Sequence, residues 1–337
     1  MIERIYRYFL HKFHARHWWY MDLCPSWKCN AKCPTCGAWK RPKDSLTARQ
    51  AETIIKDKAF RNIKYVVIEG GEPTLWPELV WFVRTFLFHH PKAKISIITN
   101  GLLVQKAVDI ARDLGGFTDR VHFVVSLNGI GPKHDESRGV PGAYDFTIRS
   151  AAIYKDAGFR VSFSFTPFKE NFDEYEKVVA KGKEMGIFVG VCYPTVSAKF
   201  GESGITWTPL PKEKLDFILT ESAKRYRWAW DKWAWLYFCE KAQAKKMMPC
   251  YAGEQLIHIN PQGTIRPCSF YETFELGTVE EGSVVLADKD LSKDVCGQIP
   301  EVCQYAIGGV CNHCEIGISL NNELPLIFSY GIRGKKG

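Results

Sequence analysis

The chain has 337 residues, 46% of them hydrophobic, and a formal net charge of +8 at pH 7. This hydrophobic content is enough for a large buried core, arranged in one large domain or in two of ordinary size. The basic residues are dispersed, and none of their runs belongs to a nucleic-acid-reading motif. The charge therefore indicates a solvated surface, and no nucleic-acid partner is expected.

The twelve cysteines are grouped at metal-ligand spacings, which favours a reducing compartment over a disulfide-bonded secreted domain. No run of about 20 apolar residues can span a bilayer, and the N-terminus lacks the apolar centre and cleavage site of a signal peptide. We expect a soluble cytoplasmic protein. Aromatic and basic residues alternate at 5–20, which makes a membrane-surface contact the alternative to a helix packed on the fold.

From about residue 18 to 193, short apolar runs rich in β-branched and aromatic residues alternate with longer amphipathic ones, as in strand–helix units with a parallel sheet. The six predicted strands lie at 17–23, 65–70, 95–100, 121–127, 161–166 and 188–194. Helices are predicted between them, including one over 47–60 and one over 77–90 that has Pro77 in its first turn. The pattern predicts an α/β fold, a partial (β/α)6 barrel whose site lies at the carboxyl ends of the strands.

The composition changes near residue 198, where a segment rich in Gly, Thr and Pro begins. We predict a barrel domain over 1–200, a helical connection over 201–247 and a small C-terminal iron-sulfur domain over 248–337. No internal repeat accompanies this division.

Cys29, Cys33 and Cys36 form a C-x3-C-x2-C array directly after the first predicted strand. Three thiolates on one short loop can ligate three irons of a 4Fe-4S cluster and leave the fourth iron open to a small molecule. The alternatives are three buried thiols, or a zinc site with a fourth ligand such as Cys24. We favour the cluster.

At these cysteines the sequence resembles the radical S-adenosylmethionine (radical SAM) superfamily, and the resemblance covers residues 18 to 193. It implies that the cluster binds S-adenosylmethionine and passes it an electron, which releases a 5′-deoxyadenosyl radical that abstracts hydrogen from a substrate. An electron donor such as flavodoxin or ferredoxin is then the expected partner. The family usually has an aromatic residue just before the third cysteine, where this chain has Thr35, so adenine is expected to pack differently here.

Later strand ends resemble cofactor-binding positions of the same family. Gly70, Gly71, Glu72 and Pro73 look like its GGEP motif, whose backbone contacts the methionine amino group, and paired glycines permit such a close approach. The other implied cofactor-binding residues are Thr99, Asn100, Ser126, Asn128, Arg138 and Ser164. The family usually has Asp where this chain has Asn128, and a surface salt bridge is the alternative role of Arg138.

Cys250 and Cys268 flank a predicted β-hairpin with its turn at 261–263, which would bring the two thiols together. Their spacing resembles the SPASM or Twitch extension of the superfamily, which carries auxiliary 4Fe-4S clusters. The resemblance implies one auxiliary cluster with four ligands, Cys250, Cys268, Cys311 and Cys314. Cys303 is the substitute for one of them, Cys296 is treated as a spectator, and a zinc site with the same thiols is the alternative.

The leading hypothesis is hydrogen abstraction from an unactivated carbon of a small-molecule or peptide substrate, with oxidation assisted by the auxiliary cluster. About 17 residues precede the first strand, and many peptide-modifying members of the superfamily carry a further leader-binding domain, which favours a small molecule. A peptide maturase and a lipid-linked substrate stay open. Cys192 is the candidate hydrogen donor of a radical epimerase, although such a cysteine is usually a small buried hydrophobe. A structural zinc-binding interaction protein is the alternative from another class.

Overall fold

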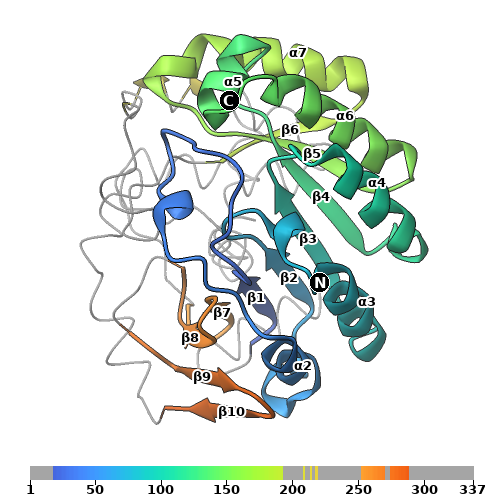
Figure 1. Ribbon diagram of the computed structural model, residues 1–337, viewed down its shortest axis with the longest axis vertical. Helices are drawn as coiled ribbons and strands as arrows, with labels where there is room; N and C mark the ends of the chain where they lie inside the picture. Colours follow the sequence, from blue (N-terminus) through green and yellow to red (C-terminus); the bar gives the residue numbers. More distant parts are fainter. Residues whose placement is uncertain are drawn as a thin grey trace, which may run out of the picture.

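The computed structural model describes residues 18–192, 208, 213–214, 217–218, 252–269 and 274–287. Its strands form one sheet in the order β10-β9-β8-β7-β1-β2-β3-β4-β5-β6 (Figure 1). The strands are β1 (Tyr20–Leu23), β2 (Tyr65–Ile68), β3 (Lys94–Thr99), β4 (Val121–Ser126), β5 (Arg160–Phe165), β6 (Phe188–Val191), β7 (Leu256–Ile259), β8 (Thr264–Arg266), β9 (Gly277–Glu280) and β10 (Ser283–Leu286). The α-helices are α2 (Ala48–Lys56), α3 (Leu79–His89), α4 (Val104–Asp113), α5 (Pro132–Arg138), α6 (Ala143–Asp156) and α7 (Tyr175–Met185).

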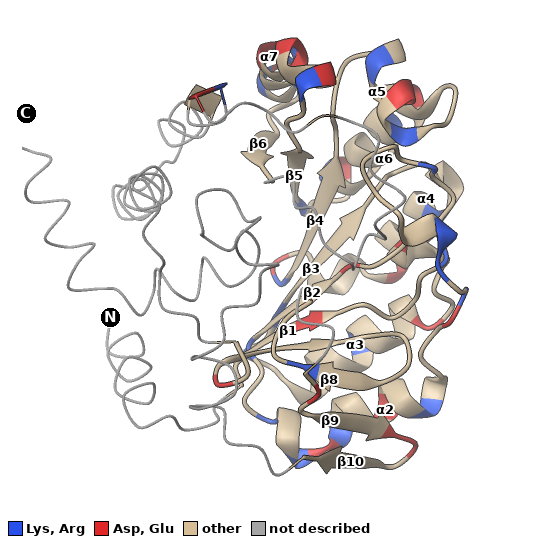
Figure 2. Cartoon of the chain, turned by 90° about the vertical axis from the view of Figure 1, so that its left-hand side faces the viewer, with Lys and Arg blue, Asp and Glu red and all other residues tan. Residues whose placement is uncertain are grey.

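Each neighbouring pair of strands from β1 to β6 is parallel, which confirms the α/β fold with a parallel sheet. Figures 1 and 2 show the helices along one side of this curved row of strands. Short 3-10 helices complete the connections at Ala38–Lys40, Lys58–Phe60, Pro73–Leu75, Gly115–Phe117 and Lys169–Glu174. The carboxyl ends of the six strands therefore meet at one edge, where loops from all of them can form a common site.

Local sequence accounts for where the first helices begin. At α2, the Thr47 hydroxyl accepts from the backbone N–H of Gln50 and the Gln50 side chain accepts from the N–H of Thr47, a reciprocal capping box. The prediction that Pro77 occupies the first turn of the next helix is wrong, because α3 begins at Leu79. The chain first makes a 3-10 turn at Pro73–Leu75, which directs Trp76 into the core before the α-helix starts.

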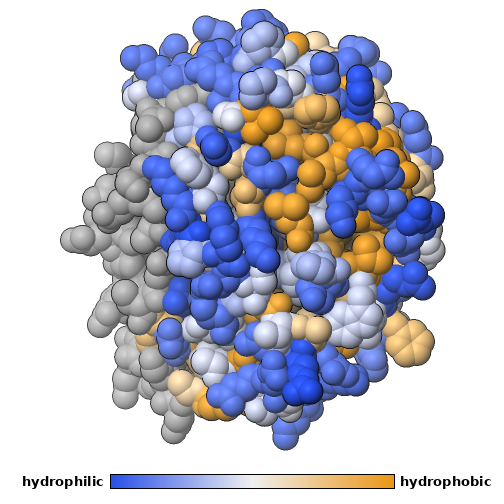
Figure 3. All heavy atoms as spheres, viewed as in Figure 1, coloured by the Kyte–Doolittle hydropathy of each residue, from blue (hydrophilic) through white to orange (hydrophobic). Residues whose placement is uncertain are grey.

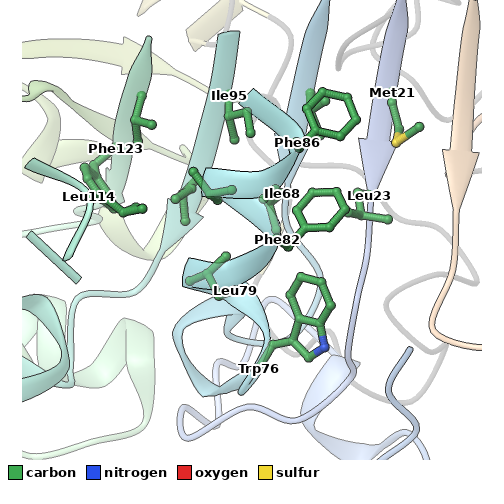
Figure 4. Packing of buried hydrophobic residues seen from close by; sticks show 14 of the residues in the cluster. Met21, Leu23, Ile68, Trp76, Leu79, Phe82, Phe86, Ile95, Leu114 and Phe123 are labelled. Atoms are coloured by element: carbon green, nitrogen blue, oxygen red, sulfur yellow. The ribbon is translucent and has the colours of Figure 1, made fainter. Parts of the chain in front are cut away.

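The main core lies between the sheet and the helices. Alternate strand residues point towards the helices, and in Figure 4 Met21 and Leu23 of β1 lie on the same side of the sheet as Phe82 and Phe86 of α3. The Phe82 and Phe86 rings stack with centroids 5.5 Å apart. Because the core takes one side of each strand, the intervening side chains face the interior of the barrel.

The β-hairpin predicted around residues 261–263 forms, with β7 and β8 antiparallel. It does not stand apart from the barrel, since β7 pairs in parallel with β1 and Asp22 is in register with His258. The Trp18 indole N–H also donates to the Gly253 carbonyl over 2.7 Å. The sheet therefore continues across the boundary predicted at residue 248. Most of the predicted connection at 201–247 lies outside the described residues.

The surface of the described part is mixed in charge and polarity. Figure 2 shows Lys and Arg interspersed with Asp and Glu over the helices. Figure 3 shows polar residues over much of one face, with an apolar area among them. Phe88 on α3 is the most exposed large hydrophobic side chain of the described residues, at 79%. None of the described helices is long and apolar enough to cross a membrane.

Candidate cofactor site

The three cysteines of the first array lie in the loop that follows β1, and all three line one cavity of about 180 Å³. Loops after the other parallel strands supply the rest of its wall. The predicted site residues that line this cavity are Gly70, Gly71, Thr99, Asn100, Ser126, Asn128, Arg138 and Cys192. The geometry thus gathers residues that are far apart in the sequence around the cysteine loop, at the carboxyl edge of the sheet.

Each of the three sulfur atoms accepts a hydrogen bond from the protein. The N–H of Ala31 donates to Cys29 Sγ over 3.5 Å, and the N–H of Ala38 donates to Cys36 Sγ over 3.4 Å. Nη1 of Arg138 donates to Cys33 Sγ over 3.6 Å. Burial raises the pKa of the Cys29 thiol to about 12. A metal that takes this sulfur as a thiolate must therefore displace its proton, which these donors assist by stabilising negative sulfur.

The glycine pair after β2 packs directly on the cysteine loop. The N–H of Gly71 donates to the Ser26 carbonyl over 2.9 Å, and a Cβ at Gly71 would overlap the Lys28 carbonyl. Gly70 has φ +116°, which other residues rarely adopt, and a Cβ there would collide with Cys24. The two glycines are needed for this close approach of two backbones.

Glu72 and Pro73 belong to the same motif but are not among the residues that line the cavity. One Glu72 carboxylate oxygen accepts from the Thr99 hydroxyl, and the other accepts from the N–H of Asn100, both over 2.7 Å. Thr74 donates to the same carboxylate through its N–H and its hydroxyl. Burial raises the pKa of Glu72 in spite of these donors. This carboxylate therefore links the end of β2 to the end of β3 through hydrogen bonds. Pro73 is the first residue of the 3-10 helix that follows Glu72.

Arg138 is the last residue of helix α5. Its side chain is buried beside Cys33, so the surface salt bridge considered as an alternative does not form. Its Nε atom is buried and has no hydrogen-bond partner among the described residues. The Arg138 carbonyl accepts from the Lys32 N–H over 2.8 Å, and a Cβ at Gly139 would collide with the Lys32 carbonyl. The end of α5 therefore packs against the cysteine loop at Lys32, a different part of the loop from the one that the glycine pair contacts.

Two asparagine side chains link the strand ends to neighbouring segments through hydrogen bonds. The Asn100 side-chain amide donates to Asn30 Oδ1 over 2.8 Å, which links the end of β3 to the cysteine loop. Asn128 Oδ1 accepts from the N–H of Thr166 over 2.9 Å, which links the end of β4 to the end of β5. The Asn128 side chain thus has a structural partner where the family's usual Asp would stand. Ser164 pairs in register with Ser126 and does not line the cavity.

Sequence reasoning missed several residues of the cavity wall. Glu69, Trp39 and Phe168 line it, although Glu69 precedes the glycine pair and Trp39 follows the third cysteine by only three residues. Trp39 donates its indole N–H to the Cys33 carbonyl over 3.4 Å, and Thr35 lines the same cavity. An aromatic ring close to Thr35 in the sequence was the signal that could have pointed to Trp39.

The profile of the Radical SAM superfamily matches residues 25–182. Over these residues, just under half of the chain, the sequence is similar to the radical SAM superfamily. This radical SAM segment contains the cysteine loop, the glycine pair and Arg138, and the superfamily implies S-adenosylmethionine and a 4Fe-4S cluster as cofactors. The match ends before Cys192 and before the hairpin.

Curated relatives are similar to this chain over segments of different length. Fe-coproporphyrin III synthase of Methanosarcina barkeri is 29% identical over 150 residues, which are 43% of this chain and 36% of that protein. Sporulation killing factor maturation protein SkfB of Bacillus subtilis is 24% identical over 262 residues, 76% of this chain and 61% of that protein. The matched segments thus span from about a third to three fifths of these two relatives.

The fold of this chain is also found in solved structures. The crystal structure of Streptococcus suis SuiB bound to S-adenosylmethionine has a TM-score of 0.61 and 18% identity, covering 88% of this chain and 69% of that one. At this identity the likeness concerns the fold.

The residues of the radical SAM cavity fit the implied cofactors in two respects. Three thiols on one wall are the donor set of a 4Fe-4S cluster with one open iron. The buried Nε of Arg138 lacks a partner among the described residues, and a carboxylate would satisfy it. Cys268 is buried after β8, whereas Cys250, Cys311, Cys314, Cys303 and Cys296 lie outside the described residues. The predicted auxiliary cluster therefore stays a prediction.

Proposed function

We propose that the chain is a radical SAM enzyme that reductively cleaves S-adenosylmethionine to a 5′-deoxyadenosyl radical, which abstracts hydrogen from an unactivated carbon of a small-molecule or peptide substrate. The observation that carries this proposal is the convergence of Cys29, Cys33 and Cys36 on one cavity beside the buried Arg138 guanidinium. A zinc site or three inert thiols would not require a buried cation next to the sulfurs. Such a reaction needs a low-potential electron donor such as flavodoxin or ferredoxin, and a reducing cytoplasm.

The chain's own residues have separate roles in this proposal. Cys29, Cys33 and Cys36 hold the cluster, and the N–H and guanidinium donors around them stabilise the thiolates. Gly70 and Gly71 allow backbone groups to approach the methionine amino group. Polar side chains from the ends of β3, β4 and α5 face the methionine carboxylate and ribose; the proposed set is Thr99, Asn100, Ser126, Asn128 and Arg138. Ser164 and the buried Glu72 support this wall from outside it.

We further propose that Cys250, Cys268, Cys311 and Cys314 hold an auxiliary 4Fe-4S cluster of the SPASM or Twitch type, which assists oxidation of the substrate. The antiparallel β7-β8 hairpin supports this, because it returns the chain after Cys250 towards its starting point before Cys268. The pairing of β7 with β1 also brings this hairpin to the barrel, next to the strand that leads into the cysteine loop. Electron transfer between two clusters requires the clusters to lie near each other, which a hairpin beside β1 would favour.

The relatives indicate two substrate classes to test. A tetrapyrrole synthase and a peptide maturation protein are both similar to this chain. The similarity to the peptide maturation protein extends over 262 residues and the other over 150. A peptide is therefore the first substrate class to test, with small metabolites second.

Anaerobic reconstitution with iron and sulfide tests the proposal. About four iron atoms per chain are expected for the core cluster alone and about eight with the auxiliary cluster. With a reductant, the loaded protein should convert S-adenosylmethionine to 5′-deoxyadenosine and methionine. Cys33→Ser should abolish this cleavage. Cys24→Ala is the matched control, because Cys24 is buried nearby but does not line the cavity. A colourless, iron-free protein after reconstitution would overturn the proposal.

Cys192 supports a second candidate function, radical epimerisation. It follows β6 and lines the same cavity as the cluster cysteines. A thiol there can return a hydrogen atom to a carbon-centred substrate radical from the face opposite to abstraction, whereas oxidation removes an electron and a proton. In deuterated water, epimerisation places one deuterium in the product. If Cys192→Ala retains that incorporation, Cys192 is not the donor.

A further inference from the structure

The cysteine loop, which joins β1 to α2 (Figure 1), has an excess of positive charge. On the described helices, basic and acidic side chains are mixed, as Figure 2 shows, and pairs such as Lys56–Glu52 neutralise each other. Residues 28–43 of the cysteine loop contain no Asp or Glu. They contain five basic residues, which are Lys28, Lys32, Lys40, Arg41 and Lys43.

Two of these cations are directly beside cluster cysteines. Lys28 precedes Cys29, and Lys32 precedes Cys33. Both lysines are exposed, whereas both cysteines line the cavity. Within the part of the chain that the structure describes, neither lysine forms an ion pair. The same short segment therefore presents its thiols to the cavity and its positive charges to solvent.

Two further cations of the loop lie against aromatic rings. Nζ of Lys40 is 5.1 Å from the centroid of the Trp39 ring, and the Arg41 guanidinium is 4.6 Å from that of the Trp27 ring. Trp39 also donates its indole N–H to the Cys33 carbonyl. Cation–π contacts of this kind restrict where a basic side chain lies. The positions of these charges are thus tied to the segment that carries the cluster thiols.

The acidic groups next to the loop leave its positive charge in excess. On α5, which contacts the loop at Lys32, Glu136 pairs with Lys133. Asp135 of the same helix accepts from two backbone N–H groups at the start of α6. Asp44, the first acidic residue after the basic segment, accepts from a side-chain amide of the β7–β8 turn. Two carboxylates that already have partners thus lie beside five cations.

The reaction proposed above needs an electron donor that approaches the cluster cysteines closely. A protein donor is too large for a cavity of about 180 Å³ and must contact the outer surface of the loop. Complementary charge accelerates and orients such transient encounters. An excess of exposed cations one residue from two cluster cysteines is suited to an acidic partner.

We propose that the basic surface of residues 28–43 is the docking surface for an acidic electron-carrier protein, such as a flavodoxin. This inference rests on the proposed radical SAM function, and it adds the place at which the electron enters. The carrier loses one electron and the cluster gains it, and no bond forms or breaks in this step. Lys28 and Lys32 contact the carrier's carboxylates, so that its redox group faces the cysteine loop.

Isothermal titration calorimetry of the cluster-loaded protein with oxidised flavodoxin, under anaerobic conditions, tests the docking surface. Binding should weaken strongly between about 0.1 and about 1 M salt, because the Debye length shortens from about 10 to about 3 Å. The double variant Lys28→Glu with Lys32→Glu should lose about tenfold or more in affinity at the lower salt, because it places like charges opposite each other.

Lys58→Glu with Lys92→Glu is the matched control, since it changes the net charge by the same amount. Both lysines are exposed and come before the starts of β2 and β3, at the opposite edge of the sheet from the cysteine loop. This variant should bind flavodoxin as the unsubstituted protein does. If the unsubstituted protein does not bind flavodoxin, or if the two double variants bind it equally, the inference is overturned.

Reduction rates separate docking from an effect of the lysines on the cluster itself. Reduced flavodoxin is compared with photoreduced 5-deazariboflavin, a small uncharged reductant. In Lys28→Glu with Lys32→Glu, the rate with flavodoxin should fall by about tenfold or more relative to the rate with 5-deazariboflavin. An equal fall with both reductants contradicts a docking role. Failure of the proposed function is recognised separately, as missing iron or missing 5′-deoxyadenosine with 5-deazariboflavin.

Discussion

Nη1 of Arg138 donates a hydrogen bond to Sγ of Cys33 over 3.6 Å, although the two residues are 105 positions apart. The same turn of α5 is joined to the cysteine loop through its backbone, because the Lys32 N–H donates to the Arg138 carbonyl. The guanidinium therefore contacts a cluster cysteine while its Nε has no partner among the described residues. One side chain can act on the thiolate and on an anionic group in the cavity at the same time.

Arg138→Met should weaken S-adenosylmethionine binding by about 10- to 150-fold, because it removes a buried charged donor worth roughly 1.5–3 kcal/mol. The dissociation constant is measured anaerobically on cluster-loaded protein by isothermal titration calorimetry. Arg84→Met, at an exposed position of α3, is the control and should bind normally. An unchanged dissociation constant for Arg138→Met at full iron content would show that Arg138 does not face the cofactor.

Gly71→Ala should displace the cysteine loop, since its Cβ would overlap the Lys28 carbonyl. We expect a loss of about 1–3 kcal/mol in unfolding free energy, as for other overpacked positions, together with reduced iron content after reconstitution. Gly116→Ala is the matched control, because nothing lies within 4 Å of a Cβ there. Denaturant unfolding and iron analysis check both variants. Equal iron content in the two would contradict the role given to the glycine pair.

Trp39→Ala should lower the affinity for S-adenosylmethionine, because Trp39 is the aromatic residue of the cavity nearest in sequence to Thr35. Stacking of a base on an aromatic ring is worth about 1–3 kcal/mol, which corresponds to about 5- to 150-fold in affinity. Trp39→Phe keeps a ring but loses the hydrogen bond to the Cys33 carbonyl and should retain most of the affinity. Trp81→Ala, at an exposed position of α3, should have no effect. Equal affinities of Trp39→Ala and the unsubstituted protein would assign adenine packing to another residue.

Acid should destabilise the fold through His134. Its Nδ1 accepts from the N–H of Asn128, and burial lowers the pKa of His134 well below its ordinary value. Below about pH 6.5 the unfolded chain binds a proton that the folded chain excludes, so stability falls by up to about 1.4 kcal/mol per pH unit down to the folded pKa. The other ring nitrogen, Nε2, is 3.2 Å from the Thr147 hydroxyl. His134→Gln can keep both hydrogen bonds without titrating. Denaturant unfolding at pH 7.5 and 5.5 should show about 1 kcal/mol less loss in this variant than in the unsubstituted protein. Identical losses would exclude His134.

The sequence predicted the six parallel strands and the cysteine array because both are local patterns. Apolar alternation identifies a strand such as Val121–Ser126 without reference to other elements. The start of α3 was misplaced, because Pro77 is compatible with a first helical turn in isolation, and the 3-10 turn before it depends on burial of Trp76. Helix starts that depend on the core cannot be read from propensity alone.

Side-chain roles inside the site were harder to predict than its location. Glu72 belongs to a recognisable motif, yet its carboxylate bonds to Thr99 and the backbone of Asn100. The hydrogen bond between Asp22 and His258 gives no sequence pattern at all. It exists only because β7 pairs with β1, and His258 and Asp22 are 236 positions apart. Contacts of this kind require knowledge of strand order, which no single segment contains.

The pairing of β7 with β1 has a consequence for how the protein is made. Trp18 and Trp19 hydrogen bond to Gly253 and Gln255, which are 235 and 236 positions later. During translation, one edge of β1 therefore stays unpaired until the hairpin has left the ribosome, although β2 is available early. Exposed strand edges pair readily with other chains, and such distant contacts form slowly. Ribosome-bound intermediates that stop short of the hairpin are the stage at which this chain is most in need of a chaperone.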